Sequence, residues 1–347
     1  MATKTELYCV MCHRSRKEES NVMSLNLTEE QLAEFRETGL LVIEDVFSPV
    51  EIEATRQGFH SHLRKLGIDH DAVLSGLASA PEIRIKSPVS RIFYPRWKLI
   101  DVHLNPKLIR LAQDLLVQTY GSDKDPNFQH PFGPFTDIRA YIDRVCYRVP
   151  DSIRKEGGLG LHLDRNPVDP YLEKGPGLTK WRPIQSLVCL TDHFHGESGG
   201  LRVVPGFHKQ IDDYFRGHQA SVPDAATAGN GGEFCRLTGI KYTELQRRCR
   251  PVIAPAGSVI FWDNRLPHAT AASLSGYDTR EVIYTGFLPD TKNNETYVAG
   301  QLVALENNKP PPAYAERDGE PGNEAGDRDF DISTLNGLQR RLLGMND

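Results

Sequence analysis

The chain has 347 residues and a formal net charge of −5, from 41 basic and 46 acidic side chains. This balance argues against a general nucleic-acid binder, which normally carries a basic surplus, and no run of about 18 apolar residues is present that could span a membrane. The first residues lack the apolar core of a signal peptide, and the six cysteines are too few for a disulfide scaffold in a chain of this length. We therefore expect a cytoplasmic protein with reduced cysteines that binds neither membranes nor nucleic acid, either as a monomer or as a homodimer.

Residues 1–24 are polar and are expected to form a flexible extension. Cys9, Cys12 and His13 within it have the spacing of a haem c attachment site and of half a zinc ribbon. A zinc site would need a second pair of ligands, and haem attachment would need export and a haem-binding domain. Since neither is visible, we interpret the motif as incidental.

Residues 25–136 are expected to form a helical part of one domain that spans residues 25–347. Capping residues precede each predicted helix, and glycine follows the first two, as is typical of helix ends. The predicted elements, in chain order, are a helix from the cap at 26–31 to Gly39, a strand over 40–43, a helix from Ser48 to about Leu66, and a helix over 106–120.

The second half of the chain changes character and predicts a mainly β core at about 137–290. Short runs rich in Val, Ile, Tyr and Leu are bounded by Gly, Pro, Asp or Asn, and no helical crossovers separate them. Such a pattern is typical of an antiparallel sandwich or barrel. The predicted strands are 137–150, 159–164, 183–191, 200–204, 257–262 and 281–288, with long loops at 166–181 and 209–249 and a C-terminal tail at 291–347 that ends in a short helix over 334–343.

His162 and Asp164 lie two residues apart at the end of a predicted strand. Side chains alternate between the two faces of a strand, so this imidazole and this carboxylate face the same side and can share one metal ion. His268 follows the strand at 257–262 and can supply a second imidazole. Two histidines and one carboxylate form the facial triad of non-haem Fe(II) oxygenases, which leaves coordination positions open. For His162 alone, a hydrogen-bonded core histidine is the alternative interpretation.

Arg280 strengthens this interpretation because it lies twelve residues beyond His268, at the start of a strand. Its planar guanidinium can bind a carboxylate through two parallel hydrogen bonds. A cation there could hold the far carboxylate of 2-oxoglutarate. The alternative is an ordinary charge at a strand edge, and the combined spacing is far more specific than any of its parts.

Between Leu25 and about Asp290 the chain resembles the phytanoyl-CoA dioxygenase (PhyH) family of Fe(II)/2-oxoglutarate oxygenases. The resemblance rests on motifs rather than on overall composition. These motifs are the opening helix–strand–helix at 27–52, His162-Leu-Asp164, the segments 186–192 and 198–209, and Ala256 to Thr270.

The resemblance implies a distorted double-stranded β-helix, a jelly roll of cupin type, flanked by helices. It implies that His162, Asp164 and His268 bind Fe(II) and are the catalytic residues, and that Arg280 binds 2-oxoglutarate with assistance from Thr270. Arg144 and Gln185 are expected to face the co-substrate, although each could instead contact the substrate or satisfy a loop carbonyl.

The implied reaction consumes O2 and 2-oxoglutarate, releases succinate and CO2, and oxidises a C–H bond of a small molecule. Asp164 favours hydroxylation over halogenation, because related halogenases have a small residue at this position; oxidative cyclisation or desaturation in biosynthesis stays open. The alternatives are a non-oxidative cupin-type metalloenzyme and a non-catalytic metal-binding relative. Several arginines favour an anionic substrate, perhaps derived from an amino acid, namely Arg96, Arg139, Arg144 and Arg182.

Overall fold

The structure is a computed structural model, and it describes residues 26–80, 91–122, 125–167, 178–194, 196–217, 235–276, 278–315 and 327–345. The N-terminal extension with Cys9, Cys12 and His13 lies outside the described residues, as does most of the loop predicted at 166–181. Four cysteines within the described part are buried and carry free thiols, in line with the prediction that they are reduced.

Two antiparallel sheets form the centre of the molecule. The strands of the six-stranded sheet run in the order β1-β9-β5-β11-β2, with β3 also paired to β11, and those of the five-stranded sheet in the order β7-β4-β10-β6-β8. The bounds of the first set are β1 Leu40–Ile43, β2 Ile138–Ala140, β3 Val145–Arg148, β5 Ile184–Cys189, β9 Val259–Asp263 and β11 Arg280–Pro289. Those of the second are β4 His162–Leu163, β6 Leu201–Val203, β7 Cys235–Arg236, β8 Arg250–Pro251 and β10 His268–Thr270.

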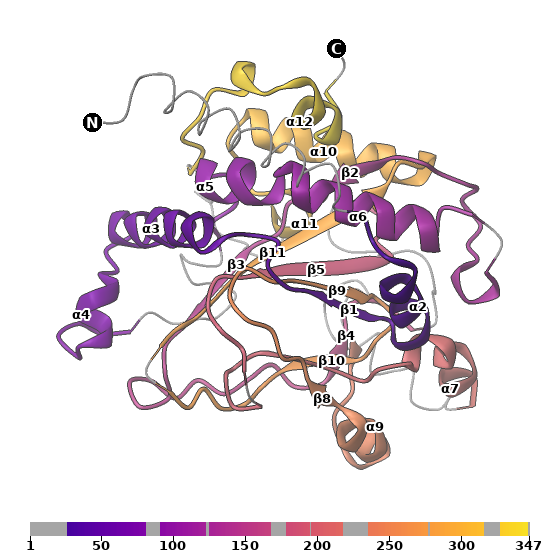
Figure 1. Cartoon of the computed structure of the whole chain (residues 1–347), viewed down its shortest axis with the longest axis horizontal. Helices are drawn as coiled ribbons and strands as arrows, with labels where there is room; N and C mark the ends of the chain where they lie inside the picture. The colour runs from indigo at the N-terminus through magenta and orange to yellow at the C-terminus, as the bar shows by residue number, and fades with distance from the viewer. Residues whose placement is uncertain are drawn as a thin grey trace, which may run out of the picture.

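Helices lie along one side of the six-stranded sheet, and the five-stranded sheet lies on its other side (Figure 1). The longer helices are α2 Glu29–Thr38, α3 Pro49–Lys65, α6 Pro106–Thr119 and α10 Glu295–Glu306. The shorter ones are α4 His70–Leu74, α5 Arg96–Lys98, α7 Ile211–Gly217, α9 Thr243–Arg248, α11 Pro312–Ala315 and α12 Gly337–Leu342. This arrangement confirms the predicted class, antiparallel β with flanking helices.

The N-terminal helices begin and end where the sequence predicts. Thr28 and Ser48 each cap a helix in a complete capping box, with Gln31 and Glu51 as the reciprocal partners. Gly39 ends α2 with a φ of 71°, a left-handed conformation that glycine adopts without strain. The turn sends the chain directly into β1, which pairs with β9 at the edge of the larger sheet.

Two apolar clusters divide the interior. One lies between the helices and the larger sheet and includes Phe59, Phe261 and Ile283. The other lies between the two sheets and includes Leu187 and Val282. Because neighbouring residues of a strand face opposite sides, β11 presents Ile283 to the helices and Val282 to the space between the sheets.

The structure differs from the predicted tail at 291–347, because α10 is a full helix there. Its sequence has little helical periodicity, because apolar residues such as Val303 also occupy the exposed face, opposite the buried Tyr297, Gln301 and Leu305. Tyr297 stacks on Tyr141, and the Gln301 side chain bonds the backbone of Ala140 and Ile142 at the end of β2. The predicted final helix is confirmed as the shorter α12.

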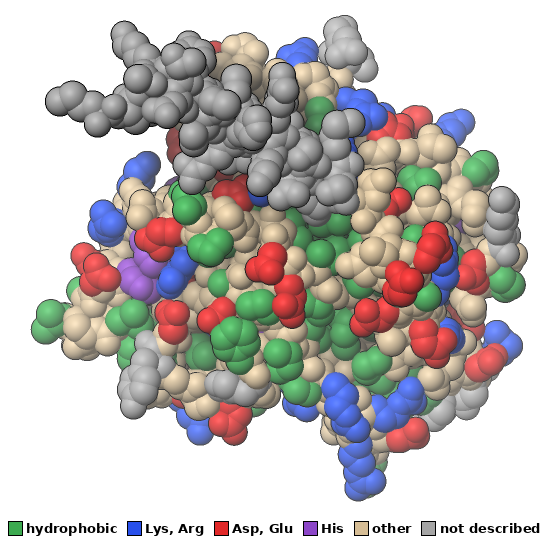
Figure 2. Space-filling model, viewed as in Figure 1, with side chains coloured by type: hydrophobic (Ala, Val, Ile, Leu, Met, Phe, Trp, Pro, Cys, Tyr) green, Lys and Arg blue, Asp and Glu red, His purple; other side chains and the backbone are tan. Residues whose placement is uncertain are grey.

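No helix among the described residues is long and apolar enough to cross a membrane. On the face shown in Figure 2, basic and acidic side chains of the described residues are intermingled, and no broad basic area is seen. This face therefore agrees with the expectation drawn from the net charge.

Candidate metal centre

The structure brings together the three residues predicted to bind metal. His162 on β4 and His268 on β10 are direct partners in the five-stranded sheet, and Asp164 follows β4. Their ligand atoms all lie within 4.8 Å of one another. The Asp164 carboxylate lies 3.4 Å from Nε2 of His162 and 3.5 Å from Nε2 of His268. Both histidines are buried and Asp164 is one-third exposed, so the cluster opens toward solvent on the carboxylate side.

Backbone carbonyls fix which nitrogen of each imidazole faces the cluster. Nδ1 of His162 lies 2.7 Å from the carbonyl oxygen of Gly160, and Nδ1 of His268 lies 3.1 Å from that of Leu266. A carbonyl only accepts hydrogen bonds, so both Nδ1 atoms carry the proton. The lone pairs on Nε2 are thereby directed toward Asp164, which is the orientation that a metal ligand needs.

The electrostatics of the cluster favour the protonation states of metal ligands. Burial opposes charge on Asp164, but hydrogen bonds from the two imidazoles, when these are protonated at Nε2, outweigh it and hold the pKa of Asp164 well below its ordinary value. Burial, together with the neighbouring His162, lowers the pKa of His268. Near neutral pH the arrangement therefore offers an anionic carboxylate and a neutral imidazole, as metal binding requires.

Arg280 is buried at the start of β11 and is only partly paired. Its Nη1 lies 3.0 Å from the sulfur of Cys146, and its guanidinium also interacts with the Tyr284 side chain. Its Nε and Nη2 have no hydrogen-bond partner among the described residues. Arg280 pairs with Arg148 across β11 and β3, and Arg148 Nη1 donates to the carbonyl of Ala271, three residues after His268. A buried guanidinium that is so incompletely paired is costly unless an anion joins it.

Two further buried residues near the site were missed by the sequence analysis. His193 is fully buried, and its Nε2 has no partner among the described residues. Burial, and then the nearby Arg280, lower the pKa of His193 to about 3, so its ring is neutral. The indole of Trp262 lies 5.7 Å from the His268 ring, and its Nε1 is likewise unpaired in the described part. Only the strand parity of Trp262, which faces the space between the sheets, could have indicated it.

The remaining predicted residues lie in different settings. Thr270 accepts a hydrogen bond of 2.6 Å from the backbone of Leu159. Gln185 is buried and donates to the side chain of Asn264. Arg144 is half-buried, with its guanidinium 4.8 Å from the centre of the Tyr314 ring.

The other arginines considered for an anionic substrate separate into two kinds. Arg96 is exposed and lies 3.7 Å from Asp101, and Arg139 forms ion pairs with Asp137 and Asp290. These two therefore belong to the surface. Arg182 is buried, with its guanidinium 4.4 Å from the centre of the Tyr141 ring.

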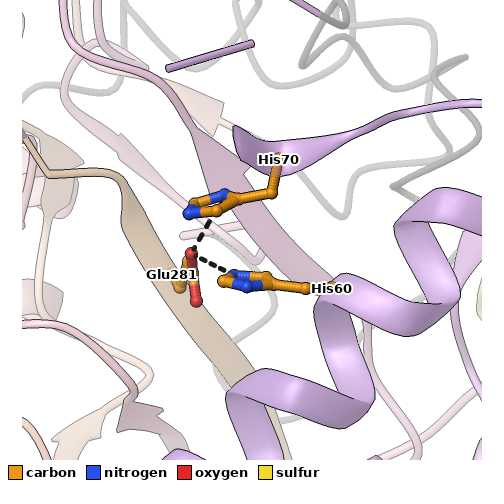
Figure 3. Close-up of side chains that lie close together, drawn as sticks. All are labelled: His60, His70 and Glu281. Carbon is orange, nitrogen blue, oxygen red and sulfur yellow. Dashed lines mark hydrogen bonds and ion pairs between the residues drawn. The ribbon is translucent and has the colours of Figure 1, made fainter. Parts of the chain in front are cut away.

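A second group of potential ligands, His60, His70 and Glu281, lies on the other face of β11 (Figure 3). The Glu281 carboxylate already accepts hydrogen bonds from Arg56 Nε at 2.9 Å and from Thr279 at 2.6 Å, and it lies 2.8 Å from Nε2 of His60. The two imidazoles are stacked, with centroids 3.8 Å apart and planes inclined by 18°. Lone pairs in nearly parallel planes do not converge on one point, so we interpret this group as an ion-pair network that joins α3 and α4 to β11.

The family model described as Gig2-like matches residues 165–345, which is more than half of the chain. The chain belongs to the Gig2-like family. His268 and Arg280 lie within the Gig2-like match, and His162 and Asp164 directly precede it. None of the curated proteins matches the chain in sequence.

Solved structures share the fold of this Gig2-like chain over nearly its whole length. A putative oxidoreductase from Salmonella typhimurium LT2 is 19% identical, with a TM-score of 0.69 and coverage of 94% of this chain and 85% of that one. GlcNAc Inducible Gene 2 (GIG2, DUF1479) from Candida albicans is 16% identical, with a TM-score of 0.63 and coverage of 92% and 81%. More distantly, HygX from Streptomyces hygroscopicus, solved with nickel and 2-oxoglutarate bound, is 21% identical, with a TM-score of 0.43 and coverage of 76% and 88%.

Proposed function

We propose that this Gig2-like protein is a non-haem Fe(II) oxygenase that uses 2-oxoglutarate as co-substrate and oxidises a C–H bond of a small anionic molecule. The observation that carries the proposal is the triad, in which two imidazoles present Nε2 toward one carboxylate. Two histidines and a carboxylate with open positions are the donor set of Fe(II) oxygenases. A cupin-type enzyme with non-oxidative chemistry would not need the buried cation nearby.

The residues present fit the metal. His162, Asp164 and His268 would hold Fe(II), because the Gly160 and Leu266 carbonyls fix the tautomers in which each Nε2 is available. With O2 and 2-oxoglutarate, the bound metal would supply the oxidising power, and succinate and CO2 would be the by-products.

Arg280 is the residue that we assign to 2-oxoglutarate. Its unpaired Nε and Nη2 are two donors of one planar fork, which matches the two oxygens of a carboxylate. The neutral His193 could add a third polar contact through its own unpaired Nε2. The apolar residues of the inter-sheet cluster would keep water from this end of the site.

The order of the strands supports the finer assignment of the fold as a double-stranded β-helix. From β3 to β6 and again from β9 to β11, successive strands alternate between the two sheets. This alternation is what a jelly roll requires, because its chain winds around both sheets at once. It also explains why His162 and His268, 106 positions apart in sequence (268 minus 162), become direct neighbours.

Equilibrium dialysis under anaerobic conditions tests the proposal. The Fe(II)-loaded protein should bind one 2-oxoglutarate per metal, and the metal-free protein should bind it much more weakly. Asp164→Ala should lose both metal and 2-oxoglutarate, whereas His60→Ala, which alters the second histidine cluster, should retain both. A protein that binds metal tightly yet shows no metal-dependent binding of 2-oxoglutarate would favour the cupin-type alternative.

A further inference from the structure

We propose that the guanidinium of Arg144 binds an anionic group of the substrate, a carboxylate or a phosphate, at the end of the inter-sheet space away from Arg280. The inference rests on the proposed function, because it takes Arg280 as the partner of 2-oxoglutarate. It gives Arg144 a role toward the substrate instead of the co-substrate.

The position of Arg144 in the sheet separates it from Arg280. The backbone N–H of Tyr284 on β11 donates to the carbonyl of Arg144 at 3.0 Å, so these two residues lie opposite one another. Tyr284 packs against the inter-sheet cluster, and directly opposed residues share a face of the sheet. The register therefore places Arg144 on the same face of the sheet as Arg280, at a position where its guanidinium also reaches Tyr314 of the apolar cluster between the helices and the sheet. The two arginines are about 13 Å apart along the sheet, because four residues of β11 separate Tyr284 from Arg280 and each adds roughly 3.3 Å.

The guanidinium of Arg144 is supported from one side and has no ion pair. The centre of the Tyr314 ring, on α11, lies 4.8 Å from this guanidinium. Such a cation–π contact holds the guanidinium in place without neutralising its charge. Among the described residues, no carboxylate lies within ion-pair distance of this guanidinium. Its neighbour Asp143 is engaged elsewhere, since it accepts hydrogen bonds from the Tyr314 hydroxyl and the Arg144 backbone and lies 3.4 Å from Arg182 Nη1.

Further cations surround this position. Arg182 lies 4.4 Å and Lys180 5.6 Å from the centre of the Tyr141 ring. Beside Asp143, Arg182 Nη1 lies 3.4 Å from its carboxylate and Lys98 Nζ donates to its carbonyl at 2.7 Å, so Asp143 is shared among several cations. A half-buried cation whose nearest carboxylate is shared in this way attracts anions, and its partial burial strengthens the attraction relative to water.

Arg144 and Arg182 lie at the end of the sheets where the triad opens. Arg182 lies two residues before Ile184, the first residue of β5, which pairs with Asp263. Asp263 lies five residues before His268 in the sequence. Asp164 is partly exposed, and the chain segment that follows it leads to Arg182. A substrate anchored by its anionic group at Arg144 could thus extend toward the triad from the open side, while 2-oxoglutarate occupies the enclosed side.

Calorimetric titration with two small anions tests the proposal. The Fe(II)-loaded protein, saturated with 2-oxoglutarate under anaerobic conditions, is titrated with propionate and with methyl phosphate. We expect at least one of them to bind, and the tighter one indicates the group that the substrate carries. Arg144→Gln should weaken that binding about ten- to hundred-fold, the range for loss of a charge-assisted pair. Arg96→Gln, which removes the same charge from the exposed surface, should leave it unchanged.

A second arm separates this inference from the proposed function. Metal-free Arg280→Gln protein lacks the cation assigned to 2-oxoglutarate, so anion binding there does not involve Arg280. There too, adding Arg144→Gln should weaken binding at least ten-fold, even if the wild type shows no metal-dependent binding of 2-oxoglutarate. Equal affinities with and without Arg144 in both arms, or no binding of either anion to the wild type, would overturn the inference.

Discussion

The histidines of the triad differ from the buried His103 and His208 in which ring nitrogen is hydrogen-bonded to a backbone carbonyl. In His103 and His208, Nε2 faces a backbone carbonyl, of Gly286 and Arg36 respectively. In His162 and His268, Nδ1 does so. The engaged nitrogen thus distinguishes imidazoles that support the core from imidazoles available to a metal. The sequence could not show this difference, because it depends on carbonyls placed by the strand ends.

The unpaired guanidinium of Arg280 leads to a prediction about the free protein. In the absence of 2-oxoglutarate, Arg280→Met should raise the free energy of unfolding by about 1–3 kcal/mol, because a buried and poorly paired charge is replaced by an apolar chain of similar length. Urea denaturation of both proteins measures this difference.

The same substitution should act in the opposite direction on co-substrate binding. Loss of a bidentate, charge-assisted pair is expected to weaken 2-oxoglutarate binding roughly ten- to hundred-fold. A variant that is less stable than the wild type and yet binds 2-oxoglutarate normally would show that Arg280 is structural.

Among the secondary-structure elements, β11 carries most of what the site needs. It pairs with β2, β3 and β5, and it presents Arg280 and Tyr284 to one face and Glu281 to the other. The sequence predicted this strand, and it singled out Arg280 by its distance of twelve residues from His268 and its place at the start of the strand. It could not predict that Glu281 would be tied to Arg56 and His60, since α3 lies more than 200 residues away and only the tertiary fold brings it there.

The Glu281 network predicts a dependence of stability on pH. Burial alone would raise the pKa of Glu281, but hydrogen bonds from His60 and Arg56 lower it to about 2. The network therefore stabilises the protein fully above the pKa of the unfolded carboxyl, near 4.5, and this contribution declines as the pH falls from 4.5 toward 2.

Glu281→Gln is the variant that checks this dependence. At pH 7 it should lower the free energy of unfolding by about 3 kcal/mol, the effect of breaking a buried ion pair. The difference from the wild type should shrink at pH 4 and below, as measured by urea denaturation at several pH values. A difference that is constant from pH 7 to 3.5 would assign the loss to packing instead of charge.

Across the whole molecule, segments from both ends of the chain support the sheet that carries the site. The N-terminal helices hold the outer face of β11, and the C-terminal segment supplies Tyr314 beside Arg144. The antiparallel core and the shared face of His162 and Asp164 were predictable, because both depend on strand alternation, whereas His268 and Arg280 were predicted from their spacing and from the family resemblance. The role of the C-terminal segment was not predictable, since α10 lacks the periodicity of a helix at a surface.

This integration of the C-terminal segment predicts that its core residues contribute to global stability. Leu342 on α12 is fully buried, so Leu342→Ala should lower the free energy of unfolding by about 2–5 kcal/mol through lost contacts and the cavity left behind. Val303→Ala on α10, where the side chain is 57% exposed, is the matched control and should change it by less than about 0.5 kcal/mol. Equal effects would mean that the segment folds independently of the core.

The most direct test of the oxygenase assignment is an anaerobic titration of the purified protein with Fe(II) and then with 2-oxoglutarate, followed by visible absorbance. We predict a weak charge-transfer band that requires both additions, disappears in Asp164→Ala and persists in His60→Ala. Folded, metal-loaded protein that develops no band on addition of 2-oxoglutarate would contradict the account.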